Sequence, residues 1–431
     1  MSVLNIQDQL LQNFEKQTKF ENNAFGETRK NAAEAFSKLG VPTVKNEDWK
    51  YSNLKGLSKR AYSFESKSDL NVKDLAELPF DFLKGIKLTF VNGIFSEELS
   101  DINFGESKLE VSNLAKLKSE GSELLNEHFG KYLDQKNEGL SALNTAFAND
   151  GMVVNIPKNT TLDRPVILNY ISDARKENVG SLAHNLIVVG ENSEAKFVEI
   201  FSTIGEESAF GNITTEIVVN ESARVDYYKI QNENDASYHV GTTQVQQKTK
   251  SYFYSATVTL NGGFVRNNLN LVLDGQHIDN HMYGLYIPNG NQHVDNHTIV
   301  DHQLPNCQSN ELYKGVLMGK STGVFNGKIF VREDAQKTNA YQNCRNVIVS
   351  DDATMNSKPQ LEIWADDVKC SHGTTTGKLN DEAIFYMQSR GIPKVEAVKL
   401  QLIAFAEDVV SQIKIEGIRE KLEELIHEKL S

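Results

Sequence analysis

Residues 252–273 read YFYSATVTLNGGFVRNNLNLVL, and this stretch decides the fold. Its two ends are rich in Val, Thr, Tyr, Phe and Leu, and turn residues separate them, which is typical of consecutive strands. Similar runs recur about every ten residues and indicate an all-β unit. The other runs are Met152–Ile156, Val166–Tyr170, Leu186–Val189, Ala195–Phe201, Ile213–Val219 and Arg224–Ile230.

This β-rich part extends from about Met152 to Cys370, which is long for a single sandwich. Its turns favour asparagine, which can line successive turns of a stacked β-solenoid. The pattern leaves two alternatives open, a solenoid or a sandwich or barrel pair. The asparagines in question are Asn267, Asn268, Asn270, Asn296, Asn326 and Asn339.

One short motif repeats within the β-rich part. Residues 276–281 read QHIDNH and residues 292–297 read QHVDNH, an offset of 16 residues. On a strand, His277, Asp279 and His281 would share a face. They could bind a metal, or they could form a row of hydrogen-bonded polar side chains, which His302 would extend.

The two ends of the chain show helical periodicity. The first part, residues 1–85, contains a helix stop at Gly40 and the motif EDWKY at 47–51, in which we expect Trp49 to anchor a packed corner. A strand-like run, Ile86 to Phe95, opens a core at 86–376, with a helical insertion at about 112–150.

The third part, residues 377–431, is predicted to contain three helices. Asn380 is a plausible N-cap for the first helix, which stops at Gly391. The second carries an apolar stripe that includes Leu402 and Phe405, and Gly417 is expected to end it. Such a stripe is either core or a docking face for a partner.

Composition narrows the class of protein. The 431 residues include 45 Lys and Arg against 58 Asp and Glu, a formal charge of −13, which argues against nucleic acid and anionic membranes as partners. No apolar run approaches the ~20 residues of a membrane span. Three cysteines are too few for a secreted disulfide framework. We therefore expect a cytoplasmic protein.

The densest chemistry lies at residues 364–377, WADDVKCSHGTTTG. Cys370 and His372 are two residues apart, so on a strand both face the same way. Thiolate and imidazole are ligands for soft metals and iron–sulfur clusters. A closed site needs about four ligands, so the others must come from elsewhere in the fold or from another chain. A purely structural role for both residues is the alternative.

Several motifs, taken together, resemble the SufB/SufD family of iron–sulfur cluster assembly proteins. They are NGKI at 326–329, AQKT at 335–338, KPQLEI at 358–363, ADDVKCSHG at 365–373, FY at 385–386 and SRGI at 389–392. The EDWKY motif is similar to the family's N-terminal signature. The D-type member is the better match, because the B-type has an acidic-His-acidic run where this chain has Cys370-Ser371-His372-Gly373.

The resemblance implies a mainly β fold, a right-handed parallel β-helix core flanked by N-terminal and C-terminal helical domains. It implies a non-catalytic scaffold in a complex with SufB and the ATPase SufC, with a nascent iron–sulfur cluster at the SufB interface. His372 matches the proposed cluster-ligand position, beside Cys370. Cys344 falls near the position of the interface cysteine of SufB, and a buried structural thiol is the alternative for it.

The C-terminal helices match the SufC-docking region, which we place at Phe385, Tyr386, Arg390, Leu402 and Phe405. The family leaves open a reduced FAD in the complex and an iron-supply role. Free strand edges at the ends of a β-helix could also pair with a second copy, so we expect a homodimer of the isolated chain. A carbohydrate-active β-helix enzyme is the alternative from another class.

Overall fold

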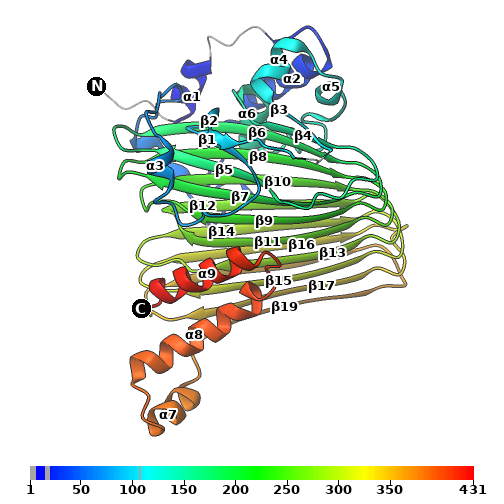
Figure 1. The fold of residues 1–431 in the computed structure, drawn as a ribbon. Coiled ribbons are helices and arrows are strands. Elements are labelled where there is room, and N and C mark those ends of the chain that lie inside the picture. Colours follow the sequence, from blue (N-terminus) through cyan, green and yellow to red (C-terminus); the bar gives the residue numbers. More distant parts are fainter. Residues whose placement is uncertain (1–5, 15–19, 106–107) are drawn as a thin grey trace.

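The computed structural model describes residues 6–14, 20–105 and 108–431. It is a parallel β-solenoid with helices over its N-terminal end and along one side (Figure 1). The predicted fold class, a mainly β core flanked by helices at both ends of the chain, is confirmed. The sandwich or barrel pair is wrong, because the strands stack in parallel within two sheets.

Two sheets form the walls of the solenoid. The first, called the odd sheet because most of its strands carry odd numbers, has ten strands in the order β19-β17-β15-β13-β11-β9-β7-β5-β1-β2. The second, called the even sheet for the same reason, has nine strands in the order β18-β16-β14-β12-β10-β8-β6-β4-β3. The odd sheet contains β1 (Ile86–Val91), β2 (Ile94–Asp101), β5 (Val166–Asp173), β7 (Glu194–Ile204), β9 (Arg224–Asn232), β11 (Tyr252–Asn261), β13 (Asp279–Tyr286), β15 (Gln308–Leu317), β17 (Asn339–Ile348) and β19 (Lys369–Gly377). The even sheet contains β3 (Glu110–Asn113), β4 (Met152–Ile156), β6 (Val179–Val189), β8 (Ala209–Val219), β10 (Tyr238–Gln247), β12 (Phe264–Leu273), β14 (His293–His302), β16 (Thr322–Val331) and β18 (Thr354–Ile363).

One full turn of the solenoid takes about thirty residues. In the odd sheet, Tyr252 pairs with Asp279, which pairs with Gln308, which pairs with Asn339. The repeated QHxDNH motif therefore spans half a turn, since its two copies lie at β13 and β14 in opposite sheets. His277 lies in the turn before β13 with φ +58°, so the prediction that it shares a strand face with Asp279 and His281 is wrong.

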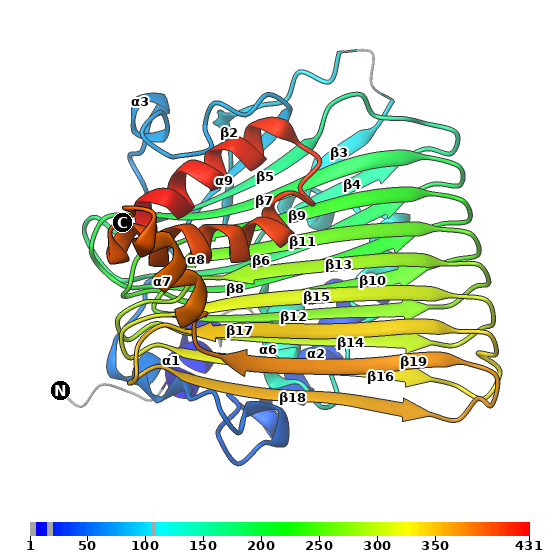
Figure 2. The ribbon, with the colours of Figure 1, turned by 90° about the horizontal axis from the view of Figure 1, so that it is seen from below.

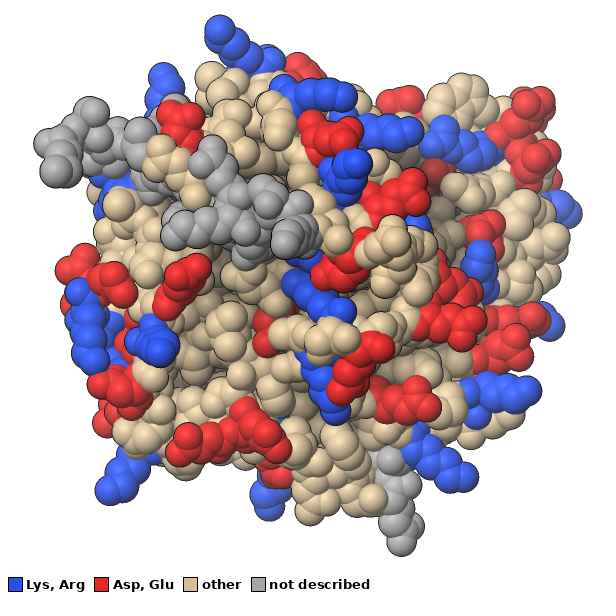
Figure 3. Space-filling model, turned by 90° about the horizontal axis from the view of Figure 1, so that it is seen from above, with Lys and Arg blue, Asp and Glu red and all other residues tan. Residues whose placement is uncertain are grey.

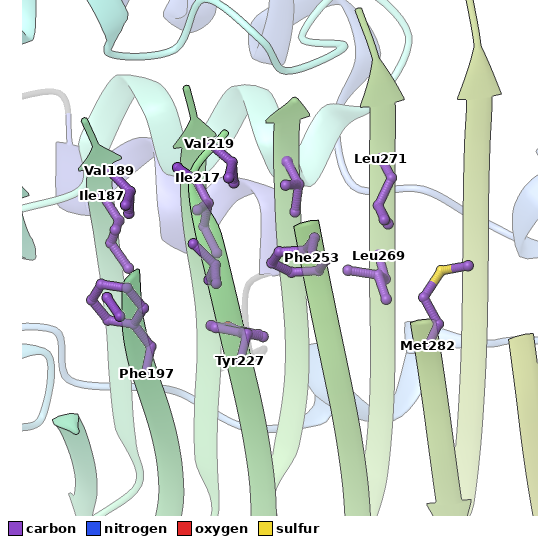
Figure 4. Close-up of a cluster of buried hydrophobic side chains, with 14 of the residues drawn as sticks. Ile187, Val189, Phe197, Ile217, Val219, Tyr227, Phe253, Leu269, Leu271 and Met282 are labelled. Atoms are coloured by element: carbon purple, nitrogen blue, oxygen red, sulfur yellow. The ribbon is translucent and has the colours of Figure 1, made fainter. Parts of the chain in front are cut away.

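Apolar side chains from both sheets fill the space between them. Figure 4 shows Phe197, Tyr227 and Phe253 of the odd sheet alongside Leu269 and Leu271 of the even sheet. The packing follows from strand geometry, because alternate residues of each strand point inward. All of these side chains are buried, so they form the principal core.

The asparagines that we assigned to turn segments lie within strands, as Asn267 does on β12 and Asn296 on β14, so that placement is wrong. In the interior these two do line successive turns of the solenoid. Asn267 and Asn296 are in register on β12 and β14. Asn267 Nδ2 donates to Asn296 Oδ1 at 3.2 Å and to Gln231 Oε1 at 2.9 Å. These bonds satisfy amide groups that would otherwise be buried without partners.

Two glycines make room for buried tyrosines in adjacent turns. A Cβ on Gly284 would lie 2.2 Å from the Tyr313 ring, and one on Gly315 would lie 2.5 Å from the Tyr286 ring. Gly284 is in register with Tyr313, and Tyr286 with Gly315. Each tyrosine therefore fills the space that the glycine of the neighbouring strand leaves empty.

The N-terminal residues form a cap over one end of the solenoid. Its helices are α1 (Ile6–Phe14), α2 (Ala24–Leu39), η1 (Glu47–Trp49), η2 (Leu54–Lys59), α3 (Val72–Leu75), α4 (Leu114–Glu120), α5 (Glu123–His128) and α6 (Gly139–Phe147). The expectation for Trp49 is confirmed, because its ring is buried and the Arg266 guanidinium lies 4.0 Å from the ring centroid. On the face of this cap seen in Figure 3, acidic and basic side chains are interspersed.

The predicted strand at Ile86 to Phe95 is two strands. Asn92 and Gly93 have φ values of +51° and +80°, which turn the chain between β1 and β2. The two strands then pair antiparallel, with Val91 opposite Ile94. Asn-Gly is the strongest short hairpin signal, but the strand-like run resumes with Ile94 and Phe95 directly after it.

Two of the three C-terminal helices, α8 (Lys394–Val410) and α9 (Glu416–Lys429), lie along the outer face of the odd sheet, and α7 (Asp381–Ser389) projects beyond β19 (Figures 1 and 2). The Asn380 side chain caps α7 as predicted. Gly417 is within the first turn of α9, so the prediction that it breaks the preceding helix is wrong. Among the described helices, none combines the length and hydropathy that a membrane crossing requires.

Candidate functional site

The solenoid has one capped end and one open end. At the open end, β18 pairs with β16 and β19 pairs with β17, and each is the outermost described strand of its sheet. Figure 2 shows β18 and β19 side by side at this end. Their outer backbone groups are free for pairing, which natural edge strands usually avoid or reserve for a partner.

The register of β19 places Cys370 and His372 on its inner face. Cys370 is in register with Ala340 and His372 with Gln342, and both partners are buried inside the solenoid. Cys370 also packs against the principal core. The prediction that the two side chains share a face therefore holds for β19, where His372 is exposed because its strand is the last of the sheet.

Cys344 lies one turn deeper than β19. It is in register with Thr374 and fully buried among Tyr286, Tyr313 and Phe325. Burial raises the pKa of its thiol to about 11, so the thiol stays protonated at neutral pH. The structure thus separates Cys344 from the exposed part of the open end. Burial also raises the pKa of the half-buried Cys370 thiol.

A buried polar column lies beneath His372. Gln342 Nε2 donates to Glu311 Oε2 at 2.8 Å, and Glu311 is in register with Gln342 on the next strand inward. Burial raises the pKa of the Glu311 carboxyl to about 7. The column therefore runs from the interior of the solenoid toward the exposed His372.

A second contact crosses the open end between the sheets. Ser357 of β18 and Thr374 of β19 are 2.8 Å apart between their hydroxyl oxygens. Our reading of the sequence missed Ser357, Gln342 and Glu311. The solenoid period could have identified Gln342 and Glu311, because Glu311, Gln342 and His372 follow one another at intervals of 31 and 30 residues.

The polar row of β14 is a hydrogen-bond network that holds the N-terminal cap. Asp295 accepts from Arg266 Nη1 at 2.9 Å and from the Ser52 hydroxyl, and its other oxygen lies 3.0 Å from His297 Nε2. Burial alone would raise the pKa of Asp295, but His297 and Arg266 hold it well below its usual range. A buried guanidinium bound to this carboxylate disfavours a metal cation there.

His302 does not extend the polar row. It points into the interior, where its Nε2 lies 2.9 Å from Ser309 Oγ, so that prediction is wrong. On β13, Asp279 and His281 lie 3.3 Å apart on the outer face. Within residues 6–14, 20–105 and 108–431, no three His, Cys, Asp or Glu side chains gather as a potential metal site.

The C-terminal residues named from the sequence fall into two groups. Phe385 and Tyr386 of α7 are 73% and 59% exposed, and Arg390 lies over the Tyr386 ring at 5.3 Å. Leu402 is 3% exposed, and Phe405 contacts Lys314 of β15 through its ring and its carbonyl oxygen. The second group packs α8 on the sheet, so a docking role for Leu402 and Phe405 does not fit their positions.

Comparisons with known proteins agree with this architecture. A family model described as SUF system FeS cluster assembly, SufBD core domain, matches residues 170–405, and one described as SufBD protein N-terminal region matches residues 4–168. An iron–sulfur cluster assembly SufBD family protein of Synechocystis is 30% identical over 92% of this chain and 89% of its own length.

Two relatives carry the name of the D-type member. The iron–sulfur cluster assembly protein SufD of Escherichia coli is 29% identical over 91% of this chain and 90% of its own length. SufD of Bacillus subtilis is 29% identical over 72% of this chain and 71% of its own length. The solenoid, its helical cap and these matches together show that the chain belongs to the SufB/SufD family of iron–sulfur cluster assembly proteins.

Proposed function

We propose that this chain is a non-catalytic scaffold subunit of a Suf complex, in which its open end forms one wall of a nascent iron–sulfur cluster site. The observation that carries the proposal is the coincidence of two features at one place. The outermost strands β18 and β19 have free edges there, and His372 is on the inner face of β19. A partner that pairs with these edges brings its own side chains to His372.

The partner that fits these edges is a second solenoid of the SufB type. Pairing by β-augmentation uses main-chain hydrogen bonds, so two stacked solenoids can continue each other's sheets. A second copy of this chain offers the same edges, which supports a homodimer when SufB is absent. In either case the exposed inner side chains of the last turn become buried.

His372 is the proposed ligand from this subunit, and Cys370 is its neighbour on the same face. Imidazole and thiolate both bind iron, and the remaining ligands come from the partner. We leave Cys344 out of the ligand set, because a fully buried thiol with a pKa of about 11 is protonated and covered by the last turn.

The ATPase-docking face belongs to α7 and the start of α8. Figure 1 shows α7 beyond β19, away from the main body of the solenoid. Phe385, Tyr386 and Val395 expose apolar surface there, and Val395 is 77% exposed. Exposed apolar side chains gathered on a projecting helix are typical of an interaction site. Leu402 and Phe405 would then transmit movement of the docked SufC to β15.

The test compares His372→Ala with Ser371→Ala in the complex with SufB and SufC, isolated anaerobically. Ser371 is a matched control, because it is exposed on the same strand and faces the opposite way. We expect iron and acid-labile sulfide to fall in His372→Ala alone, with equal assembly of all three complexes. Equal cluster content in His372→Ala would mean that this chain supplies no ligand, and would leave an iron-supply or reduced-flavin role as the alternative.

Docking of the ATPase has a separate test. Phe385→Ala with Tyr386→Ala should weaken SufC binding, measured by calorimetry, and leave pairing with SufB unchanged. Val72→Ala removes a similarly exposed apolar side chain from α3 at the capped end and serves as the control. Unchanged SufC affinity in the double variant would place the docking face elsewhere.

A further inference from the structure

One amide oxygen beneath His372 has no partner although it is buried. Gln342 is 1% exposed, its Nε2 donates to Glu311, and its Oε1 lacks a hydrogen-bond partner within the described part of the chain. Buried polar groups in folded proteins are nearly always hydrogen-bonded, so an unpaired buried acceptor calls for an explanation. The residue in register with Gln342 on the exposed side is His372.

We propose that Gln342 is the positioning residue of His372: its side-chain carbonyl accepts a hydrogen bond from one imidazole N–H, so that the other ring nitrogen faces outward with a free lone pair. Glu311 fixes the orientation of the Gln342 amide. This inference rests on the proposed function, because it assigns the outward nitrogen of His372 to iron.

The orientation follows from the chemistry of the amide. A glutamine side chain carries its donor and its acceptor on opposite branches of one carbon. Because the Nε2 branch is bound to Glu311 on the inner side, the Oε1 branch is left for a donor on another side. His372 is the next side chain of that column, and a ligating histidine generally donates its second N–H to a fixed acceptor.

The even sheet makes room for this amide. A Cβ at Gly327 of β16 would lie 2.2 Å from Gln342 Nε2, so the Gln342 amide would have to move to make room for it. The backbone of Gly327 is outside the left-handed region, so its conformation does not require glycine. The glycine at 327 is therefore explained by the Gln342 side chain, which crosses the interior at this level.

The first experiment measures the His372 tautomer in the isolated full-length chain labelled with ¹⁵N-histidine. His372→Ala assigns the resonance, and long-range ¹H–¹⁵N spectra report which nitrogen carries the proton. We expect one neutral tautomer to dominate above pH 7 in the native chain and in Gln342→Glu, which keeps an acceptor. In Gln342→Met the ratio should relax toward that of a solvent-exposed histidine side chain. An unchanged ratio in Gln342→Met would overturn the proposal.

The second experiment measures iron loss to a chelator from the assembled complex. Mutation of a residue that hydrogen-bonds a ligating histidine typically lowers metal affinity by about 10- to 100-fold, so Gln342→Met should lose iron about 10- to 100-fold faster. Gln342→Glu should stay near the native rate. A packing role predicts the reverse order, because methionine is a good isostere and a second carboxyl beside Glu311 is not. That reverse order would refute the proposal.

Two further variants guard against misfolding. Gly327→Ala keeps Gln342 but displaces its amide, and should change the tautomer ratio and iron loss in the same direction as Gln342→Met. Gln231→Met removes another buried interior glutamine, whose Oε1 accepts from Thr259 and Asn267, and should change neither. An effect of Gln231→Met equal to that of Gln342→Met would reduce the role of Gln342 to general stability.

The two proposals fail separately. If His372→Ala retains a full cluster, the proposed function is wrong whatever the tautomer of His372. If His372→Ala loses the cluster and Gln342→Met does not, the ligand assignment stands and the positioning role is wrong.

Discussion

The buried ion pair between Arg266 and Asp295 should dominate the attachment of the N-terminal cap to the solenoid. Arg266 Nη1 and Asp295 Oδ2 are 2.9 Å apart, and both side chains are almost fully buried. At an effective dielectric constant of about 20, Coulomb's law gives about 6 kcal/mol of gross attraction, which desolvation largely offsets. Removal of one partner leaves a buried charge, which costs about 3 to 5 kcal/mol.

We therefore expect Arg266→Met and Asp295→Asn each to lower the free energy of unfolding by about 3 to 5 kcal/mol. The double variant should lose less than the two single losses combined, by about 1 to 3 kcal/mol, because neither charge is then left alone. Arg332→Met is the matched control. It breaks an ion pair with Asp301 in which the arginine is 44% exposed, so it should cost below about 1 kcal/mol.

The assay uses the two tryptophans of the chain. In a Trp364→Phe background, Trp49 is the remaining tryptophan, and it lies directly beneath the Arg266 guanidinium. Urea denaturation followed by its fluorescence then reports the unfolding of the cap. Strictly additive losses in the double variant, or single losses no larger than that of Arg332→Met, would refute the assignment of this pair as the anchor.

Three other predictions concern the rest of the fold. Gly284→Ala should destabilise the chain by about 1 to 3 kcal/mol or more, because its Cβ would overlap the Tyr313 ring. Gly377→Ala, which has open space around it, should be neutral in the same urea titration. Equal effects of the two variants would contradict the packing of tyrosine against glycine in neighbouring turns. The Lys414 ammonium lies 2.7 Å from the Asp226 carboxylate and 3.7 Å from the Tyr254 ring centre, so Lys414→Met should speed hydrogen exchange in α9. Lys421→Met, which breaks an exposed ion pair with Glu424, should not. Unchanged exchange in Lys414→Met would show that other contacts hold α9. Glu311 has a pKa of about 7 in the folded chain, against an ordinary value of 4.5, so between these pH values the folded chain binds more protons than the unfolded chain. The free energy of unfolding should therefore fall as the pH rises from about 4.5 to 7. Glu311→Gln should flatten that slope, and an unchanged slope would show that Glu311 is ionised when folded.

The parts of the fold that follow from strand periodicity could be predicted from the sequence. Strand runs with turn residues between them indicated an all-β unit and left open a solenoid or a sandwich or barrel pair, and the family resemblance implied the parallel β-helix. The interior asparagines Asn267 and Asn296 bond to each other across neighbouring turns of the solenoid. The helix cap at Asn380 and the anchoring by Trp49 were also predictable, since each depends on local chemistry. The hairpin at Asn92 and Gly93 was missed because the apolar run continues across it.

The candidate site was only partly predictable, since stacking decides which residues meet. The spacing of Cys370 and His372 fixed their common face, but their place at an open end depends on where the last turn falls. Glu311, Gln342 and His372 lie in register on neighbouring strands because one solenoid turn takes about thirty residues. The repeated QHxDNH motif, with its offset of 16 residues, indicated only half of that turn. Exposure separated Phe385 and Tyr386 from Leu402, although the family resemblance placed all three in one docking region.

The central claim is that a side chain of this subunit binds the nascent cluster at the open end of its solenoid. The most direct measurement is pulsed electron paramagnetic resonance of the reduced cluster, in a complex where this chain alone carries ¹⁵N-histidine. We expect a ¹⁵N coupling of directly bound imidazole that disappears in His372→Ala and persists in Ser371→Ala. An intact cluster without ¹⁵N coupling from this chain would contradict the claim.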